Sequence, residues 1–276
     1  MTNTSRAILS IAGSDPSGGA GIQADLKTFT SLGVYGCAAI SCLTVQNTQG
    51  VYRVIPIDAE LVEEQVRKVL EDLPVSHIKL GMLGNSAIAR AVGDCLADFP
   101  GKVICDPVLK SSSGKDLLDQ AAIEDLHSQV ISRSSALTPN LSEFQALTGK
   151  NTTDRNELAA AANTLFSRHQ KLEALILKGG HLNEQAPRVT DTLFYREGND
   201  IKQEVSERPR VKTNNTHGTG CTYASALAAY HQKFGDWPQA FHLTSTYLDK
   251  LLTTSADQQM GHGTGPLHHH RYRNDK

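Results

Sequence analysis

The sequence predicts an α/β fold in which a mostly parallel central sheet is covered by helices on both faces and carries a small hairpin near one edge. Short apolar runs alternate with amphipathic stretches along most of the 276 residues, as expected for repeated strand–helix units. The apolar runs are typical of strands that are buried on both faces. No linker, repeat or low-complexity segment divides the chain, so we expect a single domain over residues 1–276.

The first elements follow from short local patterns. The run Ala-Ile-Leu-Ser-Ile-Ala at 7–12 predicts a buried strand, which leads through a glycine-rich loop into a helix over 22–32. A second strand is predicted at 37–45, before the polar segment 46–50. Apolar residues at helical spacing then predict an amphipathic helix over 59–73.

The rest of the chain repeats this alternation and ends in two helices. Further strands are predicted at 77–83, 102–105, 136–138 and 174–177, and helices at 85–98, 118–130, 142–148 and 155–169. The segments 192–196 and 201–205, joined by a turn that contains glycine, predict the edge hairpin. Helices over 221–233 and 238–254 complete the fold.

Composition argues against several classes of partner. With 27 Lys+Arg against 29 Asp+Glu and no run of like charge, nothing indicates binding to nucleic acid or to an anionic membrane. No stretch reaches the roughly 18 apolar residues of a membrane span. The five cysteines are scattered, odd in number and without a C-x-x-C pair, so we expect reduced thiols and a cytoplasmic protein.

The stretch NTHGTGCT at 215–222 is the strongest candidate for chemistry in the chain. Gly218 and Gly220 allow a tight turn and leave room for a ligand just before an alanine-rich helix. The first N–H groups of a helix lack intrahelical partners and the helix dipole adds positive charge there, so this end suits a phosphate. Cys221 lies in the first turn, where the pKa of a thiol is expected to be lowered. The alternative is a turn that only begins a buried helix.

Polar and glycine residues also gather at the predicted strand ends, where ligands bind in parallel sheets. Asp106 and Glu143 are candidate ligands for Mg²⁺, which takes one or two carboxylates together with phosphate oxygens and water. The alternative for Glu143 is an ordinary capping role. Lys178 precedes Gly179 and Gly180 at a strand end, so its ammonium is placed either to meet a phosphate or to lie exposed.

Other nucleotide and metal sites are disfavoured. The P-loop pattern G-x-x-x-x-G-K-[ST] is absent. Gly19, Gly21 and Ala24 match a dinucleotide-binding pattern, but they begin about seven residues after the strand, and Gln46 stands where an acid should end the second strand. Zinc is disfavoured because the histidines 268–270 have no cysteine cluster as partner.

Eight motifs occur in the order typical of one enzyme family. They are GSDPSGGAGIQADLKT at 13–28, QNT at 46–48, KLGML at 79–83, DPV at 106–108, TPNL at 138–141, KGGH at 178–181, NTHGTGC at 215–221 and GHGTGPL at 261–267. Through them almost the whole chain resembles the hydroxymethylpyrimidine/phosphomethylpyrimidine kinases of thiamine biosynthesis, members of the ribokinase-like superfamily. The first motif and the G-T-G-C turn are the most specific.

The resemblance implies a ribokinase-like three-layer α/β/α sandwich and a bifunctional kinase that uses ATP and Mg²⁺. The γ-phosphoryl group would pass first to 4-amino-5-hydroxymethyl-2-methylpyrimidine and then to the resulting monophosphate. The resemblance also suggests a homodimer.

Roles for single residues are implied in the same way. On the substrate, Asp25 and Gln46 would hydrogen-bond the aminopyrimidine, and Met82 and Val108 would pack on its ring. On the nucleotide, the implied residues are Asp106 and Glu143 near the metal and Lys178, Asn140, Thr213 and Thr219 near the phosphates. The amides of Gly218–Cys221 would form the anion hole, and Cys221 occupies the position where most ribokinase relatives carry an aspartate base.

Two other functions stay open on the sequence. One is a pyridoxal-type vitamin kinase of the same superfamily, and the other is a non-catalytic vitamin or pyrimidine binder on a kinase scaffold. The intact G-T-G-C turn favours a kinase over a binder. Leu109 and Lys110 stand where relatives commonly carry Met and a small residue, which leaves the roof of the pyrimidine pocket undefined.

Overall fold

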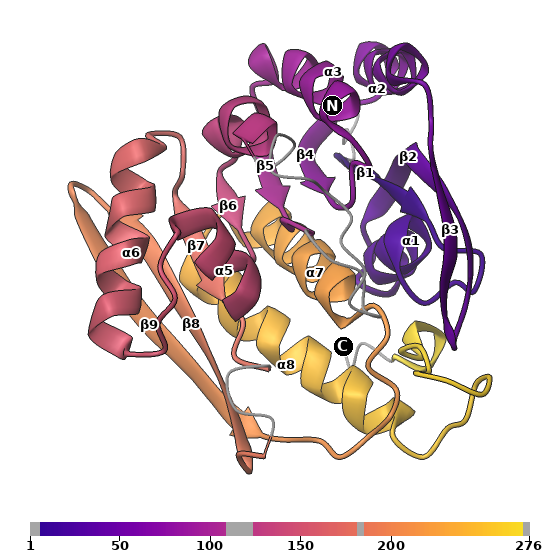
Figure 1. Cartoon of the computed structure of the whole chain (residues 1–276), viewed down its shortest axis with the longest axis vertical. Coiled ribbons are helices and arrows are strands. Elements are labelled where there is room, and N and C mark those ends of the chain that lie inside the picture. Colours follow the sequence, from indigo (N-terminus) through magenta and orange to yellow (C-terminus); the bar gives the residue numbers. More distant parts are fainter. Residues whose placement is uncertain (1–5, 109–123, 181–184, 273–276) are drawn as a thin grey trace, which may run out of the picture.

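One nine-stranded sheet runs through the molecule (Figure 1), a computed structural model that describes residues 6–108, 124–180 and 185–272. The strands lie in the order β3-β2-β1-β4-β5-β6-β7-β8-β9. From β2 to β7 they run parallel, whereas β3, β8 and β9 are each antiparallel to a neighbour. The strands are β1 Ala7–Ser14, β2 Tyr35–Asn47, β3 Gly50–Pro56, β4 Val75–Leu80, β5 Lys102–Cys105, β6 Ala136–Leu137, β7 Ala174–Leu177, β8 Arg188–Glu197 and β9 Asp200–Pro209.

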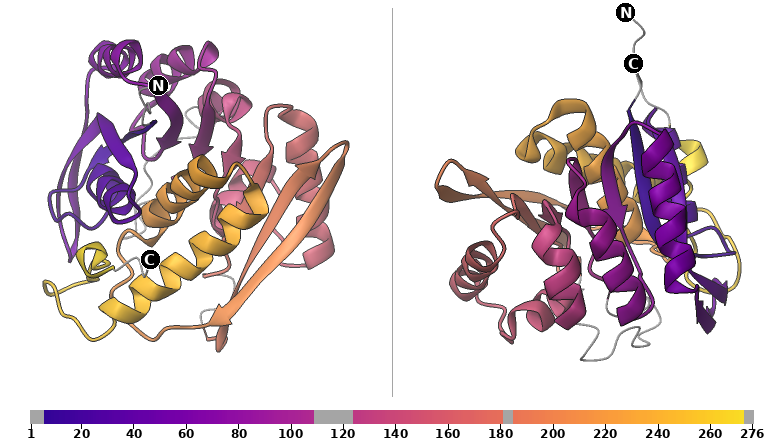
Figure 2. Two further views of the ribbon diagram at one scale, coloured as in Figure 1. Left: turned by 180° about the vertical axis from the view of Figure 1, so that it is seen from behind. Right: turned by 90° about the horizontal axis from the view of Figure 1, so that it is seen from above.

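Helices cover both faces of this sheet, as the view from above in Figure 2 shows. One layer consists of α1 Gly21–Ser31, α7 Thr219–Phe234 and α8 Trp237–Ser255. The other contains α2 Ala59–Asp72, α3 Ser86–Ala97, α5 Leu141–Thr148 and α6 Arg155–Arg168. Three short helices, η1 Leu126–Val130, η2 Ile131–Arg133 and η3 His269–Arg271, complete the described elements. The three-layer α/β arrangement predicted from the sequence is confirmed.

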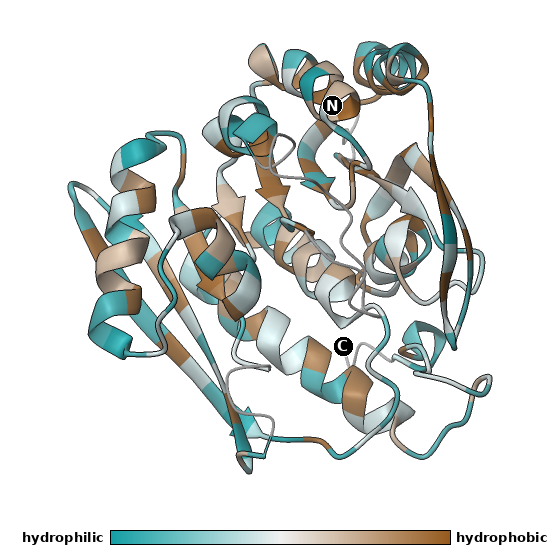
Figure 3. Ribbon diagram, viewed as in Figure 1, coloured by the Kyte–Doolittle hydropathy of each residue, from teal (hydrophilic) through white to brown (hydrophobic). Residues whose placement is uncertain are grey.

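Successive side chains of a strand point to opposite faces of the sheet, so each central strand contributes to the core on both sides. On β1, Leu9 and Ile11 pack against the α2–α3–α6 layer, while Ile8 packs against α1, α7 and α8. On β5, Val103 and Ile104 divide in the same way. Figure 3 shows the apolar colouring of the central strands between helices that carry polar residues as well. Because both faces are covered, the strands read as continuous apolar runs in the sequence.

Helix starts distinguish the site from the rest of the fold. Side chains cap α2, α3, α5, α6 and α8, with Asp58, Asn85, Asn140, Asp154 and Asp236 each accepting from a backbone N–H of the first turn. The starts of α1 and α7 have no such side-chain cap. Both helices begin at the carboxyl end of the sheet, so their first N–H groups are left for another partner.

Three expectations about elements need correction or lie outside the described residues. The segment 46–50 was expected to be a polar loop, but it contains the turn of a hairpin whose second strand, β3, is absent from the sequence prediction. β3 is an exposed edge strand and therefore has no continuous apolar run. The edge hairpin β8–β9 has ten residues in each strand, longer than expected. Of the helix expected at 118–130, residues 118–123 lie outside the described part, and Leu126–Val130 forms a π-helix.

None of the helices in the described part combines the length and apolar character that crossing a membrane requires.

Candidate active site

Two cavities meet at the start of α7. The first, of about 270 Å³, lies between the loop after β1, the β2–β3 hairpin and Met82. The second, of about 520 Å³, lies between the ends of β5 and β7, the start of α5 and the start of α7. Four residues line both cavities: Ala20, Val108, Cys221 and Thr264. In Figure 1, α7 lies near the centre of the view, between α1 and α8. Molecules bound in the two cavities would therefore face each other across the first turn of α7.

The backbone at the start of α7 requires its glycines for two different reasons. Gly218 has φ of 80°, and a Cβ there would lie 1.8 Å from the carbonyl oxygen of Gly19, so no side chain fits. At Gly220, a Cβ would lie 3.3 Å from Asp106 Oδ2 and 3.5 Å from Lys178 Nζ. The bare backbone of Gly220 thus borders the cavity opposite a carboxylate and an ammonium group. N–H groups, a cation and carboxylates converge on one small volume.

Asp106 and Lys178 form the charged floor of the second cavity. Asp106 Oδ1 accepts hydrogen bonds from Lys178 Nζ at 2.8 Å and from Thr138 Oγ1 at 3.0 Å. Both charged groups are largely buried, with 3% and 15% of their side chains exposed. Burial would lower the pKa of the Lys178 ammonium, but the carboxylates of Asp106 and Glu143 outweigh burial and raise that pKa. Lys178 therefore stays charged in this cavity.

Glu143 and Asn140 line the same cavity and also begin α5. The Asn140 side chain accepts from the Glu143 N–H at 2.9 Å, and Glu143 Oε2 accepts from the Asn140 N–H at 2.8 Å, which is a capping box. Burial raises the pKa of the Glu143 carboxyl to about 7; Lys178 opposes this shift and the negative charge of Asp106 adds to it. The capping alternative for Glu143 is thus realised, and the same side chain borders the cavity.

The comparisons with known proteins decide the family. The family model of phosphomethylpyrimidine kinase matches residues 15–268. The chain belongs to the phosphomethylpyrimidine kinase family. It is 40% identical over 264 residues to the hydroxymethylpyrimidine/phosphomethylpyrimidine kinase of Escherichia coli, with 95% of this chain and 96% of that protein covered. The enzyme of the same name from Bacillus subtilis is 37% identical, with 96% and 95% covered.

Solved structures show the same fold. The phosphomethylpyrimidine kinase of Clostridium difficile superposes with a TM-score of 0.75 at 31% identity, covering 89% of this chain and 98% of that one. The pyridoxal kinase of Staphylococcus aureus in complex with AMP-PCP and pyridoxal gives a TM-score of 0.84 at 26% identity, covering 99% and 97%. The fold is therefore that of the ribokinase-like vitamin kinases, as the resemblance implied.

The structure of this kinase brings most of the predicted site residues together. Gln46, Met82 and Val108 line the first cavity with Cys221. The second cavity is lined by Asp106, Asn140, Glu143, Lys178, Gly218, Thr219 and Gly220, and also by Val108 and Cys221. The predicted arrangement of substrate residues in one cavity and nucleotide residues in the other thus matches the geometry, although their roles are not tested by it. Leu109 and Lys110 lie outside the described residues.

Asp25 lines neither cavity, so the structure gives no support to its expected hydrogen bond to the aminopyrimidine, which stays a prediction. Its carboxylate is fully buried and accepts from Lys79 Nζ at 2.9 Å, Ser10 Oγ at 2.6 Å and Ser225 Oγ at 2.7 Å. The reason is geometric: Asp25 lies on the face of α1 that packs against α7 and β1. Its negative charge contributes to the raised pKa of the Cys221 thiol.

Thr213 also lies away from both cavities. Its hydroxyl accepts from the Asn215 N–H at 3.0 Å and shapes the chain just before the glycine turn. The expectation that it points toward the nucleotide phosphates is therefore not supported. Thr219, at the first position of α7, does line the second cavity.

The expected lowering of the Cys221 pKa is also wrong. Burial raises the pKa of this thiol to about 11, and the carboxylates of Asp25 and Asp106 add to burial against the opposite effect of Lys79. The field of a helix N-terminus is worth only about 0.3–1 kcal/mol, which is less than the cost of burying a thiolate. The thiol is neutral at pH 7.

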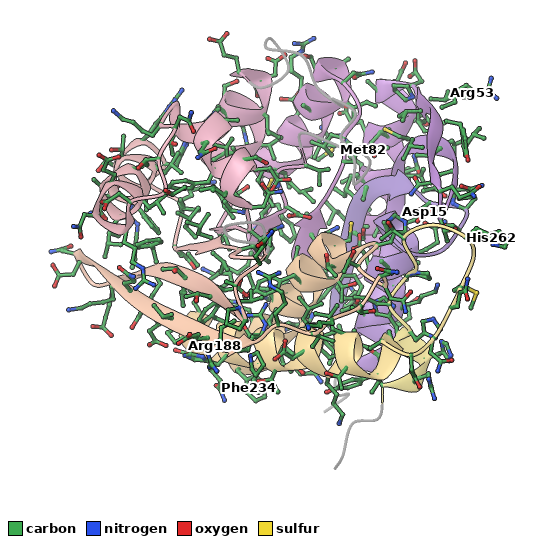
Figure 4. The ribbon with its side chains drawn as sticks, turned by 60° about the horizontal axis from the view of Figure 1, so that its bottom comes forward. Asp15, Arg53, Met82, Arg188, Phe234 and His262 are labelled. Carbon is green, nitrogen blue, oxygen red and sulfur yellow. The ribbon has the colours of Figure 1, made fainter. Side chains whose placement is uncertain are left out.

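Asp15 and His217 are site residues that the sequence analysis did not single out. Asp15 Oδ2 lies 2.7 Å from His217 Nε2, and both side chains are buried at the first cavity. In Figure 4, Asp15 and Met82 lie on the same side of the molecule, beside the loop that carries His262. The two partners are separated by 202 residues, so only their places inside two glycine-rich motifs could have pointed to them.

A second unpredicted pair supports the loop that carries Lys178. Asp191 Oδ1 accepts from the Gly179 N–H at 2.7 Å, and Asp191 Oδ2 accepts from Arg208 at 2.7 Å. Arg208 also pairs with Asp249 of α8 at 2.9 Å. Both Asp191 and Arg208 line the second cavity. The backbone after β7 is thus held by a charge network that reaches from the edge hairpin to α8.

Proposed function

We propose that this kinase transfers the γ-phosphoryl group of ATP to 4-amino-5-hydroxymethyl-2-methylpyrimidine and then to the monophosphate that it has formed. The observation that carries the proposal is the sharing of the α7 start by two cavities, one lined by Gln46, Met82 and Val108 and the other by Asp106 and Lys178. The names of the curated relatives describe the same two substrates.

The first cavity suits a flat heterocycle. Met82 and Val108 offer apolar surface, and the amide of Gln46 offers a donor and an acceptor at one edge. An aminopyrimidine presents a ring nitrogen and an amino group side by side, which match these two groups. We expect a ring held there to direct its 5-substituent toward Cys221 and the first turn of α7, where the two cavities join.

The second cavity suits a triphosphate. Lys178 supplies a fixed positive charge, and the first N–H groups of α7 supply donors without a competing side-chain cap. Asp106 and Glu143 fit Mg²⁺, because they place two carboxylates at one cavity. The pKa of Glu143 shows that this cavity disfavours a second negative charge, since burial and the charge of Asp106 raise it to about 7. When bound, Mg²⁺ would neutralise charge on the phosphate oxygens.

The chain contributes positioning and charge stabilisation more than base catalysis. A thiol with a pKa of about 11 is a thiolate in only about one molecule in 10⁴ at pH 7. Phosphoryl transfer has a loose transition state that chiefly requires alignment and stabilisation of charge on the moving group. We therefore assign the main catalytic contribution to the backbone at Gly218–Cys221 and to Lys178, with Cys221 as a neutral neighbour.

Product analysis tests the proposal. Purified protein with Mg-ATP and the pyrimidine alcohol should give the monophosphate first and the diphosphate later, each detected by mass spectrometry, with one ADP released per transfer. The monophosphate supplied alone should give the diphosphate. Failure to phosphorylate either compound, while the protein binds the alcohol, would instead indicate the non-catalytic binder.

A pyridoxal-type kinase is the second candidate, and one observation favours it. The pyridoxal kinase from Staphylococcus aureus has a TM-score of 0.84 with this chain, against 0.75 for the phosphomethylpyrimidine kinase from Clostridium difficile. Identity ranks them in the reverse order, at 26% and 31%. The same ADP-release assay with pyridoxal in place of the pyrimidine alcohol compares the two activities, and we expect the larger kcat/KM for the pyrimidine.

We also propose that the chain folds as a single cooperative unit and forms a homodimer. One sheet contains strands from residue 7 to residue 209, which supports one unit. Apolar side chains are exposed on the β2–β3 edge, including Tyr35 at 63% and Tyr52 at 60%, which supports an interface there. Light scattering after size-exclusion chromatography measures the state directly. A cytoplasmic location stays a prediction.

A further inference from the structure

His217 makes two contacts through a single ring nitrogen. Its Nε2 lies 2.7 Å from Asp15 Oδ2 and 3.1 Å from Gln46 Nε2. Asp15 also accepts from the N–H and hydroxyl of Ser17, at 2.8 and 2.7 Å, and from the Ala20 N–H at 2.8 Å. Burial would raise the pKa of Asp15, but the hydrogen bonds from His217, Ser17 and Ala20 outweigh it and lower that pKa to about 2. Asp15 is a carboxylate, so His217 Nε2 must carry the proton that it shares.

This proton fixes which end of the Gln46 amide faces His217. An amide nitrogen cannot donate to a ring nitrogen that is itself a donor. The other end of the amide gives the same result: Thr44 Oγ1 lies 2.9 Å from the Ser14 carbonyl oxygen and 3.2 Å from Gln46 Oε1, two acceptors for one hydroxyl proton. Turning the amide by 180° removes both unfavourable contacts, the N–H facing N–H at His217 and the two acceptors facing one hydroxyl proton at Thr44. Gln46 Oε1 then shares the His217 Nε2 proton with Asp15 in a three-centre hydrogen bond, and Gln46 Nε2 donates to Thr44, which donates to Ser14.

We propose that His217 is the positioning residue that sets the register of the substrate, because it holds the Gln46 amide with oxygen toward α7 and nitrogen toward β2. This inference rests on the proposed function, since it concerns how the pyrimidine edge is read. His217 directly precedes Gly218, the N-cap of α7, whereas Thr44 lies on β2. The two ends of the amide thus point to opposite ends of the first cavity.

The order of groups on the substrate makes this orientation decisive. Along one edge of the pyrimidine, ring nitrogen N3, the 4-amino group and the 5-hydroxymethyl group follow each other. With the amide held by His217, Gln46 Nε2 donates to N3 and Oε1 accepts from the amino group. The hydroxymethyl group then falls beyond His217, toward the first turn of α7. The opposite amide orientation would pair the same two groups in reverse and direct the hydroxymethyl group away from α7.

Comparison of the enzyme's activity on the substrate and on its 4-oxo analogue reports the orientation of the Gln46 amide. In 5-hydroxymethyl-2-methylpyrimidin-4-one, N3 is a donor and the 4-oxygen an acceptor, so the productive register requires the amide turned the other way. A site built to hydrogen-bond one arrangement rejects the inverted one strongly. The wild-type enzyme should therefore show a large ratio of kcat/KM for the amino substrate over the oxo analogue.

Variants at position 217 test the proposal. His217→Asn removes the donor at the Nε2 position and frees the amide, so the ratio should fall by about tenfold or more. His217→Gln places an amide nitrogen near that position and should restore much of the ratio. Ser17→Ala is the matched control, because it also removes a hydrogen bond to Asp15 but has no contact with Gln46; its ratio should equal that of wild type.

Opposite outcomes overturn the proposal. If His217→Asn lowers kcat/KM for both compounds equally and keeps the ratio, His217 only stabilises the loops and the inference is wrong. If that variant does not fold, Thr44→Val releases the amide from its other end and must lower the ratio in the same way; an unchanged ratio then refutes the inference. A wild-type enzyme inactive on the amino alcohol contradicts the proposed function instead, which keeps the two failures distinct.

Discussion

Replacement of Gly220 separates the role of the α7 backbone from that of the thiol beside it. Gly220 does not have the positive φ of Gly218, so alanine or valine at this position introduces no left-handed strain. The added Cβ would lie 3.3 Å from Asp106 Oδ2 and 3.5 Å from Lys178 Nζ, which is a close contact in the free enzyme. The same methyl group occupies the space through which a phosphoryl oxygen must approach the N–H groups of the turn. The fold should therefore survive a change that blocks the transfer.

The size of the effect follows from the hydrogen-bond donor that the methyl group would block. Loss of one preorganised donor to a developing oxyanion reduces kcat by about 10²–10³-fold. We expect Gly220→Ala to lose about that factor and the bulkier Gly220→Val to lose nearly all activity. Cys221→Ser should retain a measurable fraction of kcat, because a thiol with a pKa of about 11 is not the base at neutral pH and the smaller serine hydroxyl, which is also neutral, leaves the backbone of the turn in place. The measurement is ADP release at saturating Mg-ATP and pyrimidine alcohol, with thermal unfolding as the control for folding.

Two results would refute this reasoning. Comparable kcat values for Cys221→Ser and Gly220→Val would remove the distinction between thiol and backbone. A collapse of thermal stability in Gly220→Ala would show that the residue serves packing, since alanine in place of glycine in a helix otherwise stabilises by about 0.5–1 kcal/mol. A Tm within about 3 °C of wild type, together with the loss of kcat, supports the assignment.

Three further predictions concern charges. Lys79→Met leaves Asp25 charged and fully buried without its partner, so the free energy of unfolding should fall by about 3–5 kcal/mol in urea titrations; a change below about 1 kcal/mol would contradict a buried ion pair. Burial lowers the pKa of His77 to about 3 and of His231 to about 4, so the unfolded state binds protons first as the pH falls below 6.5, and stability should drop by up to about 1.4 kcal/mol per pH unit per histidine. If His77→Asn left the pH dependence of the free energy of unfolding below pH 6.5 unchanged, this cause would be excluded. Lys178→Met should raise KM for ATP and lower kcat by at least about tenfold with the pyrimidine KM unchanged, and equal effects on both substrates would argue for general disruption.

The parts of the fold that were predictable are those set by local physics. Strands β5 and β7 have the predicted bounds because buried parallel strands read as short apolar runs between polar loops. The β3 strand was missed because an exposed edge has no such run, and Tyr52 and Ile55 are 60% and 44% exposed. Hairpin pairing with β2, rather than its own sequence, makes it a strand.

The candidate site was predictable where motifs end strands and begin helices, and not where tertiary contacts decide. Gln46, Lys178 and Gly220 lie at chain positions that topology brings to one rim of the sheet. The full burial of the Asp25 carboxylate could not be predicted, because the sequence does not reveal which side of α1 faces solvent, cavity or core. The Cys221 pKa was misjudged because burial, a property of the whole fold, outweighs the local dipole. The separation of 202 residues between Asp15 and His217 leaves no local signal.

Two buried ion pairs and one buried carboxylate–histidine hydrogen bond connect the elements that form this site. Asp15 and His217 join the loop after β1 to the turn before α7, Asp106 and Lys178 join the ends of β5 and β7, and Asp25 with Lys79 joins α1 to β4 beneath them. Each pair spans elements far apart in sequence, so each removes a relative motion that the backbone alone would permit. Buried pairs contribute little net stability compared with apolar packing, but breaking one costs much free energy. Arrangements of the site in which a pair is broken are therefore sparsely populated. Because transfer of a phosphoryl group chiefly requires alignment, we infer that these pairs are retained for the alignment of the two cavities.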